Sequence, residues 1–265
     1  MLQLLDQLFR QVRAYIQSER LNHNQAYGQF AGHTTMQFDR EAEDIIINGL
    51  TASGYGFEII TEERPAFATS SAPSYRIVVD PVDGSTNVTR GIMTAAVSLA
   101  VLPIDVPISL EQVQWALVGE FFSGVVYQAQ RGGGAFRNGQ RCQVSGTIRL
   151  RDCLAGINFD GRDFDTLRKL VIEPPTFGKV RRTGSSAMDI VYVASGAYDA
   201  YVDIGDVITA ESFLASLCIV LEAGGVVNDQ HGKNLRQITN LTEGFSLVAS
   251  GTKELQAEIL AKVNG

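Results

Sequence analysis

The order of apolar and polar positions divides the chain into a helical start, a strand-rich middle and an alternating second half. From Leu4 to Ile16 a branched apolar residue recurs every four positions, which is the spacing of one helix face, so we predict an amphipathic helix over residues 2–20. A second helix is predicted over residues 39–53, where apolar residues share one side and acidic residues occupy the opening turns. Both helices therefore have an apolar face that must pack on another layer.

The middle of the chain has the composition of strands. Five segments rich in β-branched and aromatic residues, each bounded by turn residues, are predicted as strands: 57–61, 75–80, 95–102, 114–122 and 124–129. The run Gly132 to Gly134 and the pair Asn138-Gly139 predict tight reversals after them. A glycine-rich run could instead contact a phosphate, but a hairpin reversal explains it better.

Beyond residue 150 strands and helices alternate. The predicted strands are 153–158, 198–203, 225–228 and 245–250, and the predicted helices are 162–172, 184–194, 209–223 and 252–263. Such an order predicts stacked layers of helices and sheets. Because no repeat or linker interrupts the pattern, we expect residues 1–265 to form one compact unit with lobes over about 1–148 and 149–265.

Composition and charge narrow the class of protein. With 265 residues, 45% hydrophobic and 19% charged, the chain can bury a full core and does not have the composition of a disordered protein. Its 22 lysines and arginines against 29 aspartates and glutamates give a net charge of −7, which argues against a nucleic-acid polymer as partner. Cys142, Cys153 and Cys218 show no CxxC spacing and indicate reduced thiols rather than disulfides or a zinc site.

Neither a membrane span nor a signal peptide is expected. The most apolar run, Phe213 to Leu221, has nine residues, which is too short to cross a bilayer. Asp6 and Arg10 interrupt the apolar N-terminal stretch, which is not typical of a signal peptide. We therefore expect a cytoplasmic protein that does not enter a membrane.

The sharpest local feature follows the apolar residues 77–79. The segment reads Asp80-Pro81-Val82-Asp83, so a buried strand is expected to end in two carboxylates. Pro81 fixes the chain direction and removes one amide donor, which helps to aim its neighbours outward. The two carboxylates and the carbonyl oxygen of Val82 can converge on a hard cation such as Mg²⁺, which prefers oxygen ligands.

The next three residues, Gly84, Ser85 and Thr86, are expected at the start of a helix. Free amides and hydroxyls in that position suit a phosphate oxyanion. The alternative is an Asx-rich turn that only caps the helix, and for a bare Asp-x-x-Asp-Gly this alternative would be favoured. The full string Asp-Pro-Val-Asp-Gly-Ser-Thr-Asn after an apolar strand is far more specific.

This string resembles the signature of the inositol monophosphatase family, within the superfamily that includes fructose-1,6-bisphosphatase. Further segments resemble the family's landmarks in order: 39–43, 59–63, 124–127, 131–136, 138–140, 182–187, 194–201 and 222–225. The resemblance covers nearly the whole chain. It implies an α+β fold with layers in the order αβαβα and Mg²⁺-dependent hydrolysis of a phosphate monoester. The first lobe would carry the metals, and the second would lie on the substrate side.

The resemblance also implies roles for individual residues. Glu62, Asp80 and the carbonyl of Val82 would hold a first metal, and Asp80 and Asp83 would contribute to a second. Glu62 and Ser85 would orient and deprotonate the attacking water. The remaining implied roles are polar support of the catalytic groups by Asp39, and substrate binding by Gly84, Ser85, Thr86, Gly184, Ser185 and Asp203.

The chain departs from the family pattern at the second metal. The family has an Asp ten residues before Glu-Ala-Gly-Gly, and that position here is Ser212. Glu211 precedes it, after an approach loop over residues 203–210 that is about two residues longer than usual. Glu211 can serve the helix as a first-turn carboxylate behind a Thr209 N-cap. Alternatively Glu211, or Asp206 from the longer loop, supplies the missing ligand, so we expect a strong first metal and a weak second one.

The combined reading is a phosphomonoesterase acting on a small polyol phosphate, with inositol monophosphate as first candidate. Two cations can stabilise the attacking and leaving oxygens of the displacement, and a net-acidic protein needs them to attract a dianionic ester. Fructose-1,6-bisphosphate and a 3′-phosphonucleotide are alternative substrates, because specificity lies in the surrounding loops. A non-catalytic family member with a degraded second metal site is the alternative of another class. The resemblance further implies a homodimer.

Overall fold

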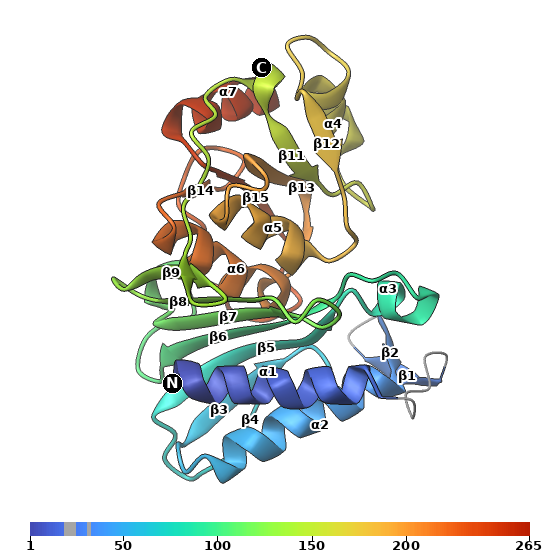
Figure 1. The fold of residues 1–265 in the computed structure, drawn as a ribbon, viewed down its shortest axis with the longest axis vertical. Coiled ribbons are helices and arrows are strands. Elements are labelled where there is room, and N and C mark those ends of the chain that lie inside the picture. Colours follow the sequence, from blue (N-terminus) through green and yellow to red (C-terminus); the bar gives the residue numbers. More distant parts are fainter. Residues whose placement is uncertain (19–24, 31–32) are drawn as a thin grey trace.

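The computed structural model describes residues 1–18, 25–30 and 33–265 (Figure 1). Helix α1 (Leu2–Ile16) and helix α2 (Gln37–Ala52) form the first layer. Both were predicted from apolar periodicity, and their apolar faces lie against one face of the first sheet. The last residues of the predicted first helix, 19 and 20, lie outside the described part of the chain.

The first sheet has eight strands in the order β10-β9-β8-β7-β6-β5-β3-β4. They are β3 (Phe57–Thr61), β4 (Phe67–Ala68), β5 (Tyr75–Asp83), β6 (Ala96–Pro103), β7 (Trp115–Glu120), β8 (Val126–Gln130), β9 (Gly134–Arg137) and β10 (Gln140–Arg141). Neighbours are antiparallel except β3 and β5, which are parallel. The carboxyl ends of β3 and β5 therefore meet at the same edge of the sheet.

The second sheet has five strands in the order β12-β11-β13-β15-β14. They are β11 (Leu154–Ile157), β12 (Lys179–Arg181), β13 (Ala200–Ile208), β14 (Val226–Asn228) and β15 (Phe245–Ser250). A separate hairpin is formed by β1 (Ala26–Phe30) and β2 (His33–Met36). The remaining elements are α3 (Ser85–Arg90), α4 (Phe164–Val171), α5 (Ser186–Ala194), α6 (Ala210–Glu222), α7 (Lys253–Asn264) and 3₁₀ turns at Leu110–Gln112 and Leu150–Asp152.

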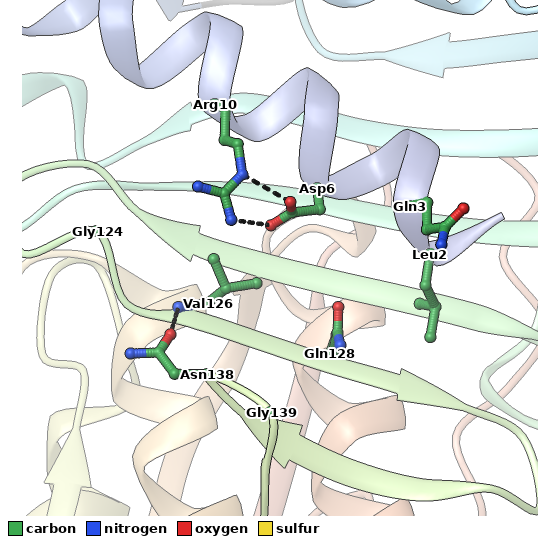
Figure 2. A pocket seen from close by; sticks show the side chains of 9 residues that line it. All are labelled: Leu2, Gln3, Asp6, Arg10, Gly124, Val126, Gln128, Asn138 and Gly139. Carbon is green, nitrogen blue, oxygen red and sulfur yellow. Dashed lines mark hydrogen bonds and ion pairs between the residues drawn. The ribbon is translucent and has the colours of Figure 1, made fainter.

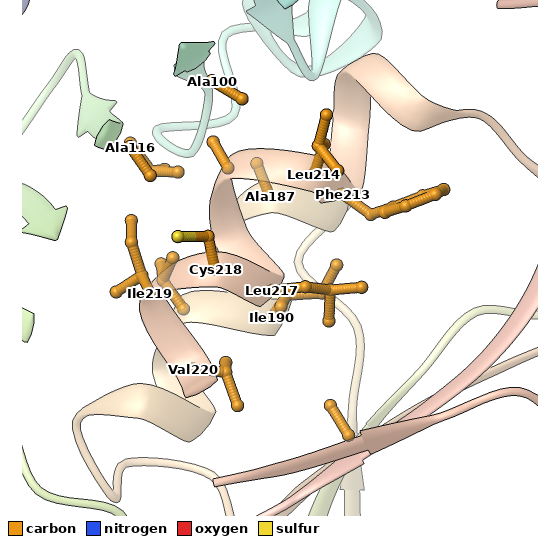
Figure 3. Close-up of a cluster of buried hydrophobic side chains, with 14 of the residues drawn as sticks. Ala100, Ala116, Ala187, Ile190, Phe213, Leu214, Leu217, Cys218, Ile219 and Val220 are labelled. Carbon is orange, nitrogen blue, oxygen red and sulfur yellow. The ribbon is translucent and has the colours of Figure 1, made fainter. Parts of the chain in front are cut away.

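The layers follow the order αβαβα. Helices α5 and α6 lie between the two sheets, and α4 and α7 cover the far face of the second sheet (Figure 1). The α+β fold implied by the family resemblance is confirmed. Figure 3 shows the middle layer, where Phe213, Leu217 and Ile190 are enclosed by side chains from both sheets. Because α6 is covered on all sides, its apolar run serves the core. Within the described ranges no helix combines the length and apolar character needed to cross a bilayer.

Two turn predictions are confirmed, and one loop prediction is wrong. Asn138 and Gly139 have positive φ and form the reversal between β9 and β10. Gly132 and Gly134 have positive φ, and their amides donate to the two carboxylate oxygens of Glu222 at 3.0 Å, so this run is a reversal tied to the end of α6. Residues 203–208 do not form an open loop, because β13 continues through them. Asp203 is the register partner of Leu247 and Ile208 that of Phe245, so five steps on β13 face two on β15. The extra residues form a bulge.

Candidate metal centre

The two carboxylates of the Asp-Pro-Val-Asp segment are brought to one face of the sheet by a bulge at the end of β5. Asp80 pairs with Ser98 and Asp83 with Ala96, so three steps on β5 face two on β6. Residues three apart on a regular strand point to opposite faces, and one extra residue corrects this. Asp80 is 2% exposed, and its Oδ1 accepts from the amide of Val82 at 3.1 Å.

Glu62 joins these carboxylates from the neighbouring strand. It directly follows β3, whose last residue Thr61 is the register partner of Val79. Burial raises the pKa of Glu62 well above its usual range, and the nearby Asp80 and Glu211 raise it further. Burial also raises the pKa of Asp80, with further contributions from Asp83 and Glu211. The carboxylates that the resemblance assigned to the metals therefore lie within electrostatic range of one another.

Asp83 is anchored by the start of α5. Its Oδ2 accepts from the hydroxyl of Ser185 at 2.5 Å and from the amide of Ala187 at 2.7 Å. Burial raises the pKa of Asp83 to about 6 although these hydrogen bonds lower it. Ser185 is fully buried. The structure therefore places Ser185 behind Asp83 as a positioning residue, and not on a surface where a substrate alcohol would touch it.

A second contact holds the same turn against α3. Asn87 donates through its Nδ2 to the carbonyls of Thr183 and Thr94, each at 2.8 Å. Gly184 has a φ of +88°, and a Cβ there would lie 2.8 Å from the Asn87 side chain. Only glycine allows this approach and this backbone conformation. Gly184 thus keeps its predicted place beside the Asp-Pro-Val-Asp-Gly-Ser-Thr-Asn loop.

Ser85 and Asp39 form a hydrogen-bonded pair. The Oγ of Ser85 lies 2.7 Å from Asp39 Oδ1 and 2.9 Å from the carbonyl oxygen of Val82. Asp39 is 2% exposed, and its Oδ2 accepts from the amide of Met36 at 3.1 Å. Burial raises the pKa of Asp39 to about 7. Gly84, at the N-cap of α3 with φ 103°, and the exposed Thr86 complete this predicted group.

Glu211 lies in the first turn of α6, as its capping role required, and also faces the carboxylates. It is 4% exposed, and its Oε1 accepts from the hydroxyl of Thr209. Burial raises the pKa of Glu211 to about 7. Asp206 does not belong to this cluster: it lies in the β13 bulge and accepts from the hydroxyl of Ser246 at 2.8 Å. Asp206 as the replacement ligand is therefore not supported.

Asp203 has a different environment from the one expected. It is fully buried, and Arg162 donates to both of its oxygens, from Nε at 2.7 Å and from Nη2 at 2.9 Å. Tyr201 donates to Asp203 Oδ2 at 3.2 Å. Because Asp203 is fully buried and paired with Arg162, a direct contact with a substrate alcohol is not available in this structure. Arg162 was missed by the sequence analysis, since it is 41 residues away along the chain.

The donor set fits a hard divalent cation. All candidate ligands are carboxylate or carbonyl oxygens, which Mg²⁺ prefers, and their mutual repulsion is relieved by positive charge. In the described ranges, no three His, Cys, Asp or Glu side chains are already gathered to the spacing of a metal site. A partner atom is nevertheless needed at this place, since Oε2 of Glu211 is buried without a hydrogen bond.

A groove elsewhere on the molecule has no part in this cluster. It lies between α1 and strand β8 (Figure 2). Its volume is about 550 Å³. Arg10 and Asp6 line it and form an ion pair at 2.7 Å, and Asn138 Oδ1 accepts from the amide of Val126 at 2.8 Å. None of the clustered carboxylates borders the groove.

The comparisons with known proteins identify the family of this chain. The model of the inositol monophosphatase family matches residues 3–265. An inositol-1-monophosphatase of Mesorhizobium japonicum is 34% identical over 88% of this chain and 83% of its own length. A fructose-1,6-bisphosphatase/inositol-1-monophosphatase of Methanothermobacter thermautotrophicus is 33% identical over 86% of this chain and 83% of its own. The crystal structure of the extragenic suppressor protein suhB from Bartonella henselae superposes with a TM-score of 0.82 at 26% identity, covering 99% of this chain and 98% of that one.

Proposed function

Because the chain belongs to the inositol monophosphatase family, whose members are metal-dependent phosphatases, we propose that it hydrolyses a small polyol phosphate with Mg²⁺ as cofactor. The chain is a phosphoric monoester hydrolase. The proposed metal site is supported mainly by one observation. Glu62, Asp80 and Asp83 lie close together at the ends of the parallel strands β3 and β5.

Glu62, Asp80 and the Val82 carbonyl would hold the first ion, and Asp80 and Asp83 would contribute to a second. When bound, such ions stabilise charge on the attacking and leaving oxygens of a phosphoryl transfer. The protein itself positions the carboxylates that would bind these ions. The β5 bulge directs Asp80 and Asp83 to one face, and the start of α5 fixes Asp83 through Ser185.

Ser85 and Asp39 are suited to move a proton. A water oriented by Glu62 would give its proton to Ser85 Oγ, while the hydroxyl proton of Ser85 moves to Asp39 Oδ1, 2.7 Å away. Because burial raises the pKa of Asp39 above its ordinary value, this carboxylate is a stronger proton acceptor than an exposed aspartate. The amides of Gly84 and Ser85 would bind the phosphate, with Thr86 at its exposed side.

Inositol monophosphate is the first candidate substrate, and the names of the relatives support both it and fructose-1,6-bisphosphate. A 3′-phosphonucleotide is the third candidate. The turn at Gly184 would border the alcohol portion of the ester. A homodimer, a cytoplasmic location and the absence of a nucleic-acid partner belong to the same proposal, supported by the family and by the net charge of −7.

The test is phosphate release from a panel of inositol, sugar and nucleotide phosphates, with Mg²⁺ and with EDTA. We expect turnover that requires the ion, with the preferred ester read from kcat/KM. Turnover that persists in EDTA would contradict the metal-dependent mechanism. A protein that hydrolyses no member of the panel would instead support the non-catalytic alternative.

A further inference from the structure

Two buried glutamates each leave one oxygen without a hydrogen bond, and their surroundings differ. Oε1 of Glu43 and Oε2 of Glu211 are the two carboxylate oxygens of this kind among the described residues. The other oxygen of Glu43 forms an ion pair with Arg64 at 2.5 Å, and Arg40 lies 3.4 Å away. In the part of the chain that the structure describes, no arginine or lysine forms an ion pair with Glu211.

The position of Glu211 is fixed by three features of the fold. Its carbonyl oxygen accepts from the buried hydroxyl of Ser98 on β6 at 2.8 Å. Its Oε1 accepts from Thr209, the N-cap residue of α6. The β13 bulge, which ends at Ile208, delivers the chain to this point. These contacts fix the side chain of Glu211 within electrostatic range of Glu62, Asp80 and Asp83, and they leave its Oε2 buried without a hydrogen bond.

Ser212, the next residue, contacts Asp80 through a hydrogen bond. Its hydroxyl donates to Asp80 Oδ2 at 3.2 Å, while Asp80 Oδ1 accepts from Val82. Both oxygens of Asp80 are thus oriented by hydrogen bonds. A neutral hydroxyl is a poor ligand for a hard divalent ion compared with a carboxylate.

We propose that Glu211 Oε2 is the anionic ligand by which this chain completes a second divalent-cation site with Asp80 and Asp83, and that Ser212 is a positioning residue for Asp80. This inference rests on the proposed function and names the residues of the second ion. The ligand chemistry is a hard divalent cation, because every available donor is oxygen.

The same contacts make the second site dependent on phosphate. Asp83 Oδ2 already accepts two hydrogen bonds, and Glu211 Oε1 accepts one, so few anionic oxygens are free. An ion that requires near-octahedral oxygen coordination then completes its shell with water and a phosphate oxygen. Binding of the second ion is expected to tighten when inorganic phosphate is present.

The test is a titration of the full-length protein with Mn²⁺, in which free ion is measured by electron paramagnetic resonance with and without inorganic phosphate. Wild type is expected to bind one ion tightly and a second mainly with phosphate. Glu211→Gln keeps the side-chain size and should weaken the second step by about tenfold or more, while the first step remains. Glu222→Gln makes the same change at the other end of α6, where the carboxylate binds the Gly132–Gly134 turn, and should change neither step.

A double variant adds a rescue. Glu211→Gln/Ser212→Asp returns a carboxylate to the next position and should restore the second step. Ser212→Ala should weaken binding at Asp80 without abolishing it, and Ser212→Thr should retain it. An unchanged second step in Glu211→Gln, or a single ion in wild type even with phosphate, would overturn the assignment. Because the titration does not use turnover, a protein without phosphatase activity can still pass or fail it.

Discussion

Two buried carboxylates, Asp203 and Glu211, lie near the two ends of one bulge in β13. They differ in whether the protein supplies a positive charge beside them. Asp203 is fully buried and receives two hydrogen bonds from Arg162 and one from Tyr201, so the chain itself supplies its counter-charge. Glu211 is also buried, with 4% of its surface exposed, but the charged groups that interact with it are other carboxylates. A buried carboxylate is tolerated when it is paired with a positive charge, and otherwise it takes up a proton or requires a positive charge from outside the chain. Asp203 therefore has its counter-charge within the protein, whereas Glu211 requires a cation or a proton from solution.

The comparison separates a carboxylate that stabilises the fold from carboxylates that are candidates for metal binding. Asp203 ties residues 160–162 to the second sheet, since Arg162 also donates to the carbonyl of Asp160 at 2.6 Å. In the part of the chain that the structure describes, Glu211, Glu62 and Asp80 form no ion pair with an arginine or lysine, and burial raises the pKa of each. Carboxylates that are held close together reduce stability, and such groups with raised pKa values are typical of functional sites.

The largest effect is expected from removing the charge shared by both proposed ions. Asp80→Asn keeps the shape but loses the anion, and we expect phosphate release to fall about 10³-fold or more, because the ions supply several kcal/mol to the transition state. The free energy of unfolding in EDTA should not decrease, since a repelled carboxylate has been neutralised. Normal turnover in this variant would show that the Asp-Pro-Val-Asp assignment is wrong.

A substitution beside the paired carboxylate Asp203 should change stability, in contrast to Asp80→Asn, which should change activity. Arg162→Met removes the guanidinium and leaves Asp203 buried without its counter-charge, and we expect a loss of about 3 kcal/mol in the free energy of unfolding. The measurement is urea denaturation. Arg182→Met is the matched control, because that arginine pairs with the exposed Asp160 and should cost far less. Equal losses in both variants would mean that burial does not distinguish the two ion pairs.

Local elements were predictable, because their signals are local. The strand over 57–61 and the strand over 245–250 match the predicted bounds, since alternation and flanking turn residues define them. Strands of two or three residues, such as Phe67–Ala68, carry too short a pattern to be recognised. The bulge in β13 was taken for a lengthened loop from the comparison with the family pattern, which shows extra residues but not whether they leave the strand. Gly205 and Asp206 have positive φ in this bulge.

The site was predictable in its composition and not in its contacts. The motif indicated Asp80, Asp83 and Ser85, and the resemblance added Glu62 and Asp39. The partner of a side chain across the fold has no signal in spacing. Ser185 lies 102 residues from Asp83 along the chain, and the burial that turns it from a substrate contact into a support for that carboxylate depends on how α5 packs.

A smaller effect concerns the pH dependence of stability without metal. Burial raises the pKa of Glu211 to about 7, so its contribution to stability is full below the ordinary pKa of about 4 and is lost as the pH rises through 7. In EDTA at pH 8, Glu211→Gln should therefore unfold with a free energy about 2 kcal/mol higher than wild type, and the difference should vanish at pH 4.

The control is the same pair of unfolding curves with saturating Mg²⁺ and phosphate. Here the order should reverse at pH 8, because the ion stabilises the wild-type carboxylate and binds the glutamine poorly. A wild type that is more stable than Glu211→Gln at pH 8 in EDTA would mean that Glu211 is compensated within the chain, as Asp203 is. That result would remove the contrast between the two ends of the bulge.

The smallest effect is expected from lithium. The family resemblance implies that lithium inhibits through the second metal site, and in this chain that site has the neutral Ser212 at the family's aspartate position. With one oxygen of Glu211 bound to Thr209 and one of Asp83 bound to α5, a monovalent ion finds few free anionic oxygens. LiCl should therefore reduce phosphate release little beyond the same concentration of NaCl, which controls for ionic strength. Ser212→Asp adds a carboxylate and should increase the sensitivity. If wild type is already as sensitive as Ser212→Asp, lithium binds the second site without a carboxylate at position 212, and the weak binding attributed to this site is wrong.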